Sequence, residues 1–172
     1  MLEERSAEYR SDNFFIRKAD DSDYDNFKQV CEAEYLIGRI YKHQPDIAMK
    51  CFWETLFEGD DIHYSVFLQD GEFLGRVSLQ YGRCKYPEIA IVVVKKYQNQ
   101  GYATKLLREW CSWVYEVYGY SRFDVLIDTE NAPSMKLFKR LGVIWDSEEG
   151  SIAECHFELP FKIEMTMLKC VF

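Results

Sequence analysis

One stretch of the chain joins an apolar run to a short polar loop and then to an amphipathic pattern of helical period. The apolar run is Ile89–Val94, and the loop Gln98–Thr104 contains a single glycine, Gly101. The first turn of a helix has unpaired backbone N–H groups and the positive end of the helix dipole, so this junction is a place to hold a phosphate. Gly101 lets the backbone approach a ligand because it has no Cβ. The alternative is an ordinary strand-to-helix loop that holds no ligand.

Two standard nucleotide-binding motifs are absent from this sequence. Residues 101–105 contain no Gly-Lys-Ser/Thr and are therefore not a Walker loop. A single glycine also excludes the Gly-x-Gly-x-x-Gly pattern of dinucleotide sites. Lys95 and Lys96, directly before the loop, add positive charge in a chain whose formal net charge is −8. The local chemistry favours a phosphate group without identifying the molecule that carries it.

The loop and the run before it form a block with a known counterpart. Gln98-x-x-Gly101-x-Ala103 resembles the Gln/Arg-x-x-Gly-x-Gly/Ala signature of the GNAT superfamily of N-acyltransferases. Glu88–Val94 is similar to the strand that precedes this signature in the family. Taken alone, this block is a weak signal.

A second block follows after one expected helix and one expected strand. Asn131-x-x-Ser134-x-x-Leu137-Phe138-x-x-x-Gly142 resembles the family's Asn-x-x-Ala/Ser-x-x-Leu-Tyr-x-x-x-Gly-Phe. Together the two blocks are a strong signal for a GNAT N-acetyltransferase. The sequence departs from the family where Phe138 replaces the usual Tyr and where Val, not Phe, follows Gly142.

The resemblance implies an acetyl-CoA site and no metal. Backbone N–H groups of the loop would bind the CoA pyrophosphate, at Gln98, Asn99, Gln100, Gly101, Tyr102, Ala103 and Thr104. The pantetheine arm would pair with the strand at Val92, Val93 and Val94, because a strand edge offers free N–H and C=O groups to an amide-rich chain.

The second block would complete the cofactor site through Asn131, Ser134 and Phe138. The alternative for Asn131 is a plain helix N-cap, and the two roles are compatible. Because Phe138 has no hydroxyl, the family's proton donor for the leaving CoA thiolate is missing. That role is then vacant, or it is filled by another tyrosine or by water.

The resemblance also implies two catalytic groups. The backbone N–H of Val92 would stabilise charge on the thioester oxygen as an amine attacks. A primary amine attacks only when neutral, so a base or a water relay is needed. Glu88 matches the family position that carries this base in several members. The alternative is a surface carboxylate at the polar start of a strand.

Three functions therefore stay open. The first is transfer of an acetyl group from acetyl-CoA to a primary amine of a small molecule or of a peptide or protein N-terminus. The second is a CoA-binding regulatory module with reduced catalysis, which Phe138 motivates. The third is an interaction domain without a cofactor.

The substrate wall expected from the family lies in residues 27–58 and 150–162. Candidate lining residues are Tyr35, Arg39, Tyr41, His43, Trp53 and Glu54. These side chains fit the core or the surface equally well. The three histidines, His43, His63 and His156, have no paired ligand spacing, and we expect them to be structural or exposed.

The elements that must position these residues follow from apolar periodicity. Strands are expected at residues 14–16, 62–68, 73–79, 89–94, 123–127, 152–159 and 163–168. Helices are expected at residues 20–37, 45–58, 104–118 and 131–141. This order predicts an α/β layered fold. The resemblance adds a mixed, mostly antiparallel sheet with a splayed central strand pair and helices on both faces.

The composition sets the remaining bounds. The polar residues 1–12 predict a flexible tail, and the length of 172 residues predicts one domain, at residues 13–172. The acidic balance argues against a nucleic-acid partner. Six cysteines without a Cys-x-x-Cys pair argue against a metal site and favour a cytoplasmic protein. We expect no membrane partner, and a homodimer is compatible with the sequence.

Overall fold

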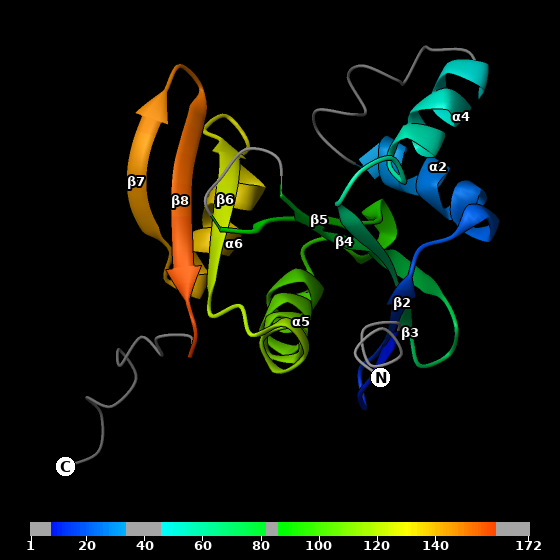
Figure 1. Ribbon diagram of the computed structural model, residues 1–172, viewed down its shortest axis with the longest axis horizontal. Helices are drawn as coiled ribbons and strands as arrows, with labels where there is room; N and C mark the ends of the chain where they lie inside the picture. Colours follow the sequence, from blue (N-terminus) through cyan, green and yellow to red (C-terminus); the bar gives the residue numbers. More distant parts are fainter. Residues whose placement is uncertain (1–7, 34–45, 82–85, 161–172) are drawn as a thin grey trace.

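The central feature of the protein is one mixed β-sheet. The computed structural model describes residues 8–33, 46–81 and 86–160. Within these residues, eight strands form a sheet in the order β1-β2-β3-β4-β5-β6-β8-β7 (Figure 1). The strands are β1 Glu8–Arg10, β2 Phe14–Lys18, β3 Ile62–Leu68, β4 Phe73–Gln80, β5 Glu88–Val93, β6 Arg122–Asp128, β7 Ile144–Glu149 and β8 Ile152–Glu158.

Helices cover both faces of this sheet. They are α2 Tyr24–Ala33, α4 Asp46–Thr55, α5 Tyr102–Tyr118 and α6 Ala132–Leu141, with short 3-10 turns η1 Asp21–Asp23 and η2 Lys95–Tyr97. Figure 1 shows α2 and α4 together on one side of the sheet and α5 on the other. The expected layered α/β fold with helices on both faces is confirmed. No helix in the described ranges is both long and apolar enough to span a membrane.

The main core lies between the sheet and α5. The apolar stripe of α5 is fully buried at Leu106, Leu107, Trp110, Cys111 and Val114. It packs with alternate residues of the sheet, which is the arrangement that a helix of period 3.6 and a strand of period 2 dictate. The helix ends as expected at Gly119, whose left-handed backbone lets its N–H donate to the carbonyl of Tyr115.

The chain is ordered earlier than the sequence predicted. Glu8–Arg10 pairs antiparallel with β2, so part of the expected tail at residues 1–12 is a strand. The contacts that hold it are distant in sequence. Ser11 and Asn13 donate to the carboxylate of Glu109 on α5, at 2.7 and 2.6 Å. A polar segment was mistaken for a tail because its partners lie on a helix about 100 residues later.

The closing strands also differ from the prediction. All six residues of β7 are exposed, so this strand lacks the alternating apolar pattern by which strands are found in sequence. The predicted strand at residues 152–159 is confirmed as β8. The predicted strand at residues 163–168, the end of the helix expected to reach Ile37, and Pro45 lie outside the described residues.

The sheet splays at its only parallel pair within the described residues. β5 and β6 share one paired position, Glu88 opposite Asp124, whereas β6 pairs with β8 over its whole length. The N–H of Asp124 donates to the carbonyl of Pro87 at 3.0 Å. The two strands therefore part from this point toward their carboxyl ends, and the expected splayed central pair is confirmed.

Candidate active site

The backbone of β5 faces β4 at alternate residues. The N–H of Val94 donates to the carbonyl oxygen of Leu74 at 2.9 Å. Hydrogen-bonded residues alternate in an antiparallel ladder, so Val92 also directs its N–H and C=O toward β4. A Cβ added to Gly75 would lie 2.0 Å from the carbonyl oxygen of Val92, in agreement with that direction. The predicted roles of the Val92 and Val94 backbones, oxyanion donation and pantetheine pairing, are therefore wrong, because these groups serve the sheet.

The backbone N–H and C=O groups at the splayed edge of β5 belong to the residues that alternate with those bonded to β4. Ile91 and Val93 direct their N–H and C=O groups away from β4, toward the side where β6 has departed. The carbonyl oxygen of Val93 accepts a hydrogen bond from the Nε2 of Gln98 at 2.9 Å. Val93 was predicted to contact the cofactor and lies on the open edge, whereas Ile91 was missed.

The loop after β5 has two residues in the left-handed conformation. Asn99 has φ 61° and Gly101 has φ 85°. A Cβ added to Gly101 would meet no atom within 4 Å, so the glycine is needed for its backbone angle and the space beside it is open. The loop thus reverses the chain into α5 without filling the space at the helix start.

The N-terminus of α5 has no side-chain cap among the described residues. The N–H groups of Tyr102, Ala103 and Thr104 lie in its first turn, where a helix supplies no backbone acceptor. Lys105 makes the first backbone hydrogen bond of the helix, to the carbonyl of Gly101 at 3.2 Å. The geometry leaves the donors and the positive dipole end available to an anion.

One of the two lysines before the loop, Lys96, is paired with a carboxylate. Lys96 and the hydroxyl of Tyr97 both donate to the carboxylate of Glu72. The hydrogen bond from Lys96 lowers the pKa of Glu72, and the same pairing raises the pKa of Lys96. The expectation that Lys96 serves the loop is therefore corrected, since its charge is paired with the hairpin between β3 and β4.

The second sequence block builds α6. Asn131 caps this helix, with its side-chain oxygen accepting from the N–H of Ser134 at 3.2 Å. Phe138 is 4% exposed and belongs to the main core. The N-cap alternative for Asn131 is confirmed. Cofactor contacts of Asn131, Ser134 and Phe138 stay predictions.

Glu88 lies where β5 and β6 meet, at the base of the splay. It is 9% exposed, which excludes the surface carboxylate that was its alternative. The register sets Glu88 opposite Asp124, and Asp124 opposite His156 of β8. His156 Nδ1 lies 2.7 Å from the Oδ2 of Asp146. His156 was expected to be structural or exposed; it is buried, and its neighbours on β6 and β7 were not visible in the sequence.

These features are those of a known family. A family model for the acetyltransferase (GNAT) domain matches residues 13–144. The chain belongs to the GNAT acetyltransferase family. The L-amino acid N-acetyltransferase AaaT of Escherichia coli (strain K12) is 24% identical over 132 residues, which are 74% of this chain and 80% of that protein.

Solved structures share the GNAT fold. The spermidine N-acetyltransferase from Vibrio cholerae in complex with CoA and spermine superposes with a TM-score of 0.66 at 13% identity, over 86% of this chain and 96% of that chain. A domain from Methanocaldococcus jannaschii DSM 2661 superposes with a TM-score of 0.67 at 17% identity, over 85% and 98%. At these identities the likeness establishes the fold.

Two residues of the predicted substrate wall of this GNAT protein are described. Trp53 is buried and packs on Phe27 of α2, with ring centroids 4.9 Å apart, so it belongs to the core between α2 and α4. Glu54 is exposed. The other candidates, Tyr35, Arg39, Tyr41 and His43, lie outside the described residues.

A second buried polar group lies on the α2 side of the GNAT sheet. His63 is 5% exposed, and neither ring nitrogen has a hydrogen-bond partner among the described residues. Burial and the nearby Arg76 guanidinium lower the pKa of His63 to about 4. His63 is therefore a neutral core histidine at physiological pH, as expected for a structural residue.

Proposed function

We propose that this protein transfers an acetyl group from acetyl-CoA to a primary amine. One observation carries the proposal: the uncapped start of α5, with Gly101 at φ 85°, lies directly after a strand whose outer edge, beyond Glu88, pairs with no other strand in the described part of the chain. A helix N-terminus binds phosphate and a strand edge binds amides, and CoA has both groups in one chain. The CoA-bound Vibrio cholerae relative has the same fold, which supports this use.

The cofactor contacts follow from the corrected strand direction. The loop Gln98–Thr104 would hold the pyrophosphate, and Val93 would receive the adjoining part of the pantetheine arm. Ile91 lies two residues further from the loop, toward Glu88, so its N–H is the better donor to the thioester oxygen. This replaces Val92 in that role.

Before it can attack the thioester, the substrate ammonium must lose one proton. A substrate amine with a pKa near that of lysine is protonated at pH 7 and has no lone pair for attack. Glu88 is the candidate base, because it is buried at the base of the splay. After attack, the tetrahedral intermediate loses a second proton from its nitrogen as the C–S bond breaks and the CoA thiolate leaves, and the thiolate is then protonated. A thiol has a pKa of about 8.5, so the thiolate leaves without a protein hydroxyl at Phe138.

The acceptor is a small-molecule amine or a peptidyl N-terminus. The curated relative is an L-amino acid N-acetyltransferase, and a structural relative is a spermidine N-acetyltransferase. Both names describe enzymes that acetylate amines of small molecules, which favours that class. A CoA-binding module with reduced catalysis is the alternative that Phe138 still motivates.

A thiol-release screen tests the proposal. The full chain is incubated with acetyl-CoA and, in turn, amino acids, polyamines, aminoglycosides and peptides. We expect amine-dependent release of CoA for at least one class. CoA binding without release from any amine would favour the binding module, and absence of a CoA-induced thermal shift would overturn the cofactor site.

CoA binding by the variant Gly101→Asp tests whether the pyrophosphate site lies at the start of α5. Gly119→Asp is the matched control. Both glycines are left-handed, lie at opposite ends of α5 and have open space beside them. Asp tolerates this conformation better than most residues. At position 101 its carboxylate repels the pyrophosphate, so CoA binding is lost there alone. Equal effects of the two variants would contradict the assignment.

A further inference from the structure

A row of polar side chains crosses four neighbouring strands at the base of the splay. Glu88 on β5 is opposite Asp124 on β6, and Asp124 is opposite His156 on β8. Paired residues of adjacent strands project from the same face of a sheet. Asp146, at an irregularity in the β7–β8 register, hydrogen-bonds the ring of His156 at 2.7 Å.

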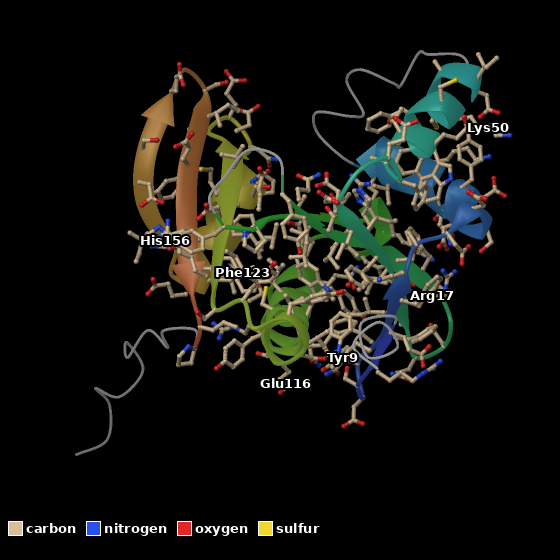
Figure 2. The ribbon with its side chains drawn as sticks, viewed as in Figure 1. Tyr9, Arg17, Lys50, Glu116, Phe123 and His156 are labelled. Atoms are coloured by element: carbon tan, nitrogen blue, oxygen red, sulfur yellow. The ribbon has the colours of Figure 1, made fainter. Side chains whose placement is uncertain are left out.

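The row lies on the face opposite the α5 core. Alternate residues of β6 and β8, such as Phe123 and Phe157, are buried against that core. Figure 2 shows the side chains of Phe123 and His156 on opposite sides of the sheet, with His156 beside β7. His156 is 7% exposed and Glu88 is 9% exposed. Burying ionisable groups costs free energy that apolar residues would save, so stability alone does not explain the row.

Asp146 fixes the chemistry of His156. An ionised carboxylate only accepts hydrogen bonds, so the bond requires a proton on Nδ1. Nε2 is then the basic nitrogen of the ring. The side chain of Asp146 is 40% exposed, which connects the row to solvent.

Other charged groups surround this pair. Arg122 on β6 lies 3.3 Å from the carboxylate of Asp124 and 3.9 Å from that of Asp146, and the ring of Tyr86 packs on its guanidinium. Glu154 and Glu158 lie two residues to either side of His156 on β8. Arg122 offsets part of the acidic charge of the row.

Acetyl transfer from acetyl-CoA to an ammonium substrate releases one proton for each turnover. We propose that His156, oriented by Asp146, takes up the proton that Glu88 removes from the substrate, with Asp124 between them. An ammonium N–H bond breaks as an O–H bond forms on Glu88. That O–H bond then breaks as an O–H bond forms on the Asp124 carboxylate. The Asp124 O–H bond breaks in turn as an N–H bond forms on Nε2 of His156, and the imidazolium later returns the proton to water. His156 is thus a positioning residue for Glu88, and its role rests on the proposed function.

The spacing suits such a transfer. Neighbouring strands lie about 4.8 Å apart, so the backbones at Glu88 and His156 are about 10 Å apart. The carboxylate of Asp124, on the strand between them, divides this distance into two short steps. An acid formed at the base of the splay therefore has a route to solvent that does not pass the acyl group.

The first test measures the coupling between Glu88 and His156 and does not require turnover. NMR titration of the full chain follows the His156 ring, which His156→Gln identifies among the three histidines. A carboxylate about 10 Å away favours the imidazolium measurably. Removing this negative charge by Glu88→Gln should therefore lower the His156 pKa by at least about 0.3 units. An unchanged His156 pKa overturns the proposal, whether or not an acceptor amine is known.

The second test uses turnover with an amine found in the screen. His156→Gln and Asp146→Asn should lower kcat about tenfold or more near neutral pH, while KM for acetyl-CoA stays unchanged. The deficit should shrink as pH rises, and added imidazole should restore part of the rate of His156→Ala. Glu154→Gln, on the same strand and face, is the matched control and should behave like the wild type.

The outcomes separate the two proposals. Wild-type turnover with an unaltered pH profile in His156→Gln overturns the relay and leaves the acetyltransferase assignment intact. Absence of turnover in the wild type, together with a His156 pKa that responds to Glu88→Gln, overturns the proposed function. The NMR titration then decides the coupling of the row by itself.

Discussion

Gln98 holds the end of β5 through its side chain, with Nε2 lying 2.9 Å from the carbonyl oxygen of Val93. That carbonyl is on the open edge of the strand, where no residue of β6 is paired with it. The signature glutamine therefore ties the loop Gln98–Thr104 to the strand that would receive the pantetheine arm. This hydrogen bond adds a side-chain link between the loop and the edge to the backbone bond from the N–H of Tyr97 to the carbonyl of Val94.

Gln98→Leu removes that bond at nearly constant volume. We expect acetyl-CoA to bind about two- to tenfold more weakly, the effect of one net hydrogen bond on the ordering of the loop. Calorimetric titration with CoA measures it. Gln100→Leu is the control, because its side-chain Nε2 donates to the carbonyl of Lys96 within the preceding turn. Equal affinities of the Gln98 variant and the wild type would contradict the tie.

Glu88→Gln tests the base. The amide is isosteric and cannot accept a proton from the ammonium, so kcat should fall about 100-fold near neutral pH. CoA affinity should be nearly unchanged, because Glu88 lies at the opposite end of β5 from the loop. A pH–rate profile over the accessible range is the measurement. Unaltered kcat with an assigned amine would remove Glu88 from this role.

Gly75→Ala tests the close approach of β4 and β5. A Cβ there would lie 2.0 Å from the carbonyl oxygen of Val92, and backbone atoms cannot yield cheaply. We expect the free energy of unfolding to fall by more than about 2 kcal/mol, as for other severe steric changes. Gly71→Ala is the control, since Gly71 is left-handed but has open space beside it, and should cost about 1 kcal/mol. Urea denaturation measures the free energy of unfolding of both variants. Similar losses in the two variants would contradict a clash at position 75.

Most of the architecture could be predicted from the sequence, but only part of the candidate site. Apolar periodicity was sufficient for the hairpin of β3 and β4 and for α5, because burial imposes that period. Three adjacent valines, Val92 to Val94, show no difference in sequence that tells which N–H faces β4. That choice is made by pairing with Leu74, which is distant in sequence. His156 was unreadable for the same reason, since its neighbours come from three other strands.

Two variants of Asn131 distinguish its role as a helix cap from a role in cofactor binding. Asn131→Ala should reduce the free energy of unfolding by about 1 kcal/mol, because the N–H of Ser134 loses its acceptor. Asn131→Ser keeps a capping oxygen and should retain most of that stability. If Asn131 also contacts CoA, the Ser variant will bind CoA more weakly at wild-type stability. Thermal unfolding with and without CoA measures both quantities, and unaltered CoA affinity in the Ser variant would leave Asn131 as a cap alone.

His63 makes the stability of the fold depend on pH. Its pKa is about 4 in the folded protein, below the ordinary 6.5, because burial and Arg76 disfavour the charged ring. The unfolded chain therefore binds a proton at a higher pH than the folded chain. The stability associated with neutral His63 is complete above pH 6.5 and is lost as pH falls toward 4, by about 3 kcal/mol in total.

His63→Leu should remove this slope. Leucine would replace a neutral ring whose nitrogens have no hydrogen-bond partner in the described part of the chain, so it costs little at pH 7, and it cannot be protonated at pH 4.5. Urea unfolding at pH 7, 6, 5 and 4.5 should show the variant gaining on the wild type at each step. Parallel curves for the two proteins over this range would contradict a neutral buried His63, because the other titrating groups are common to both.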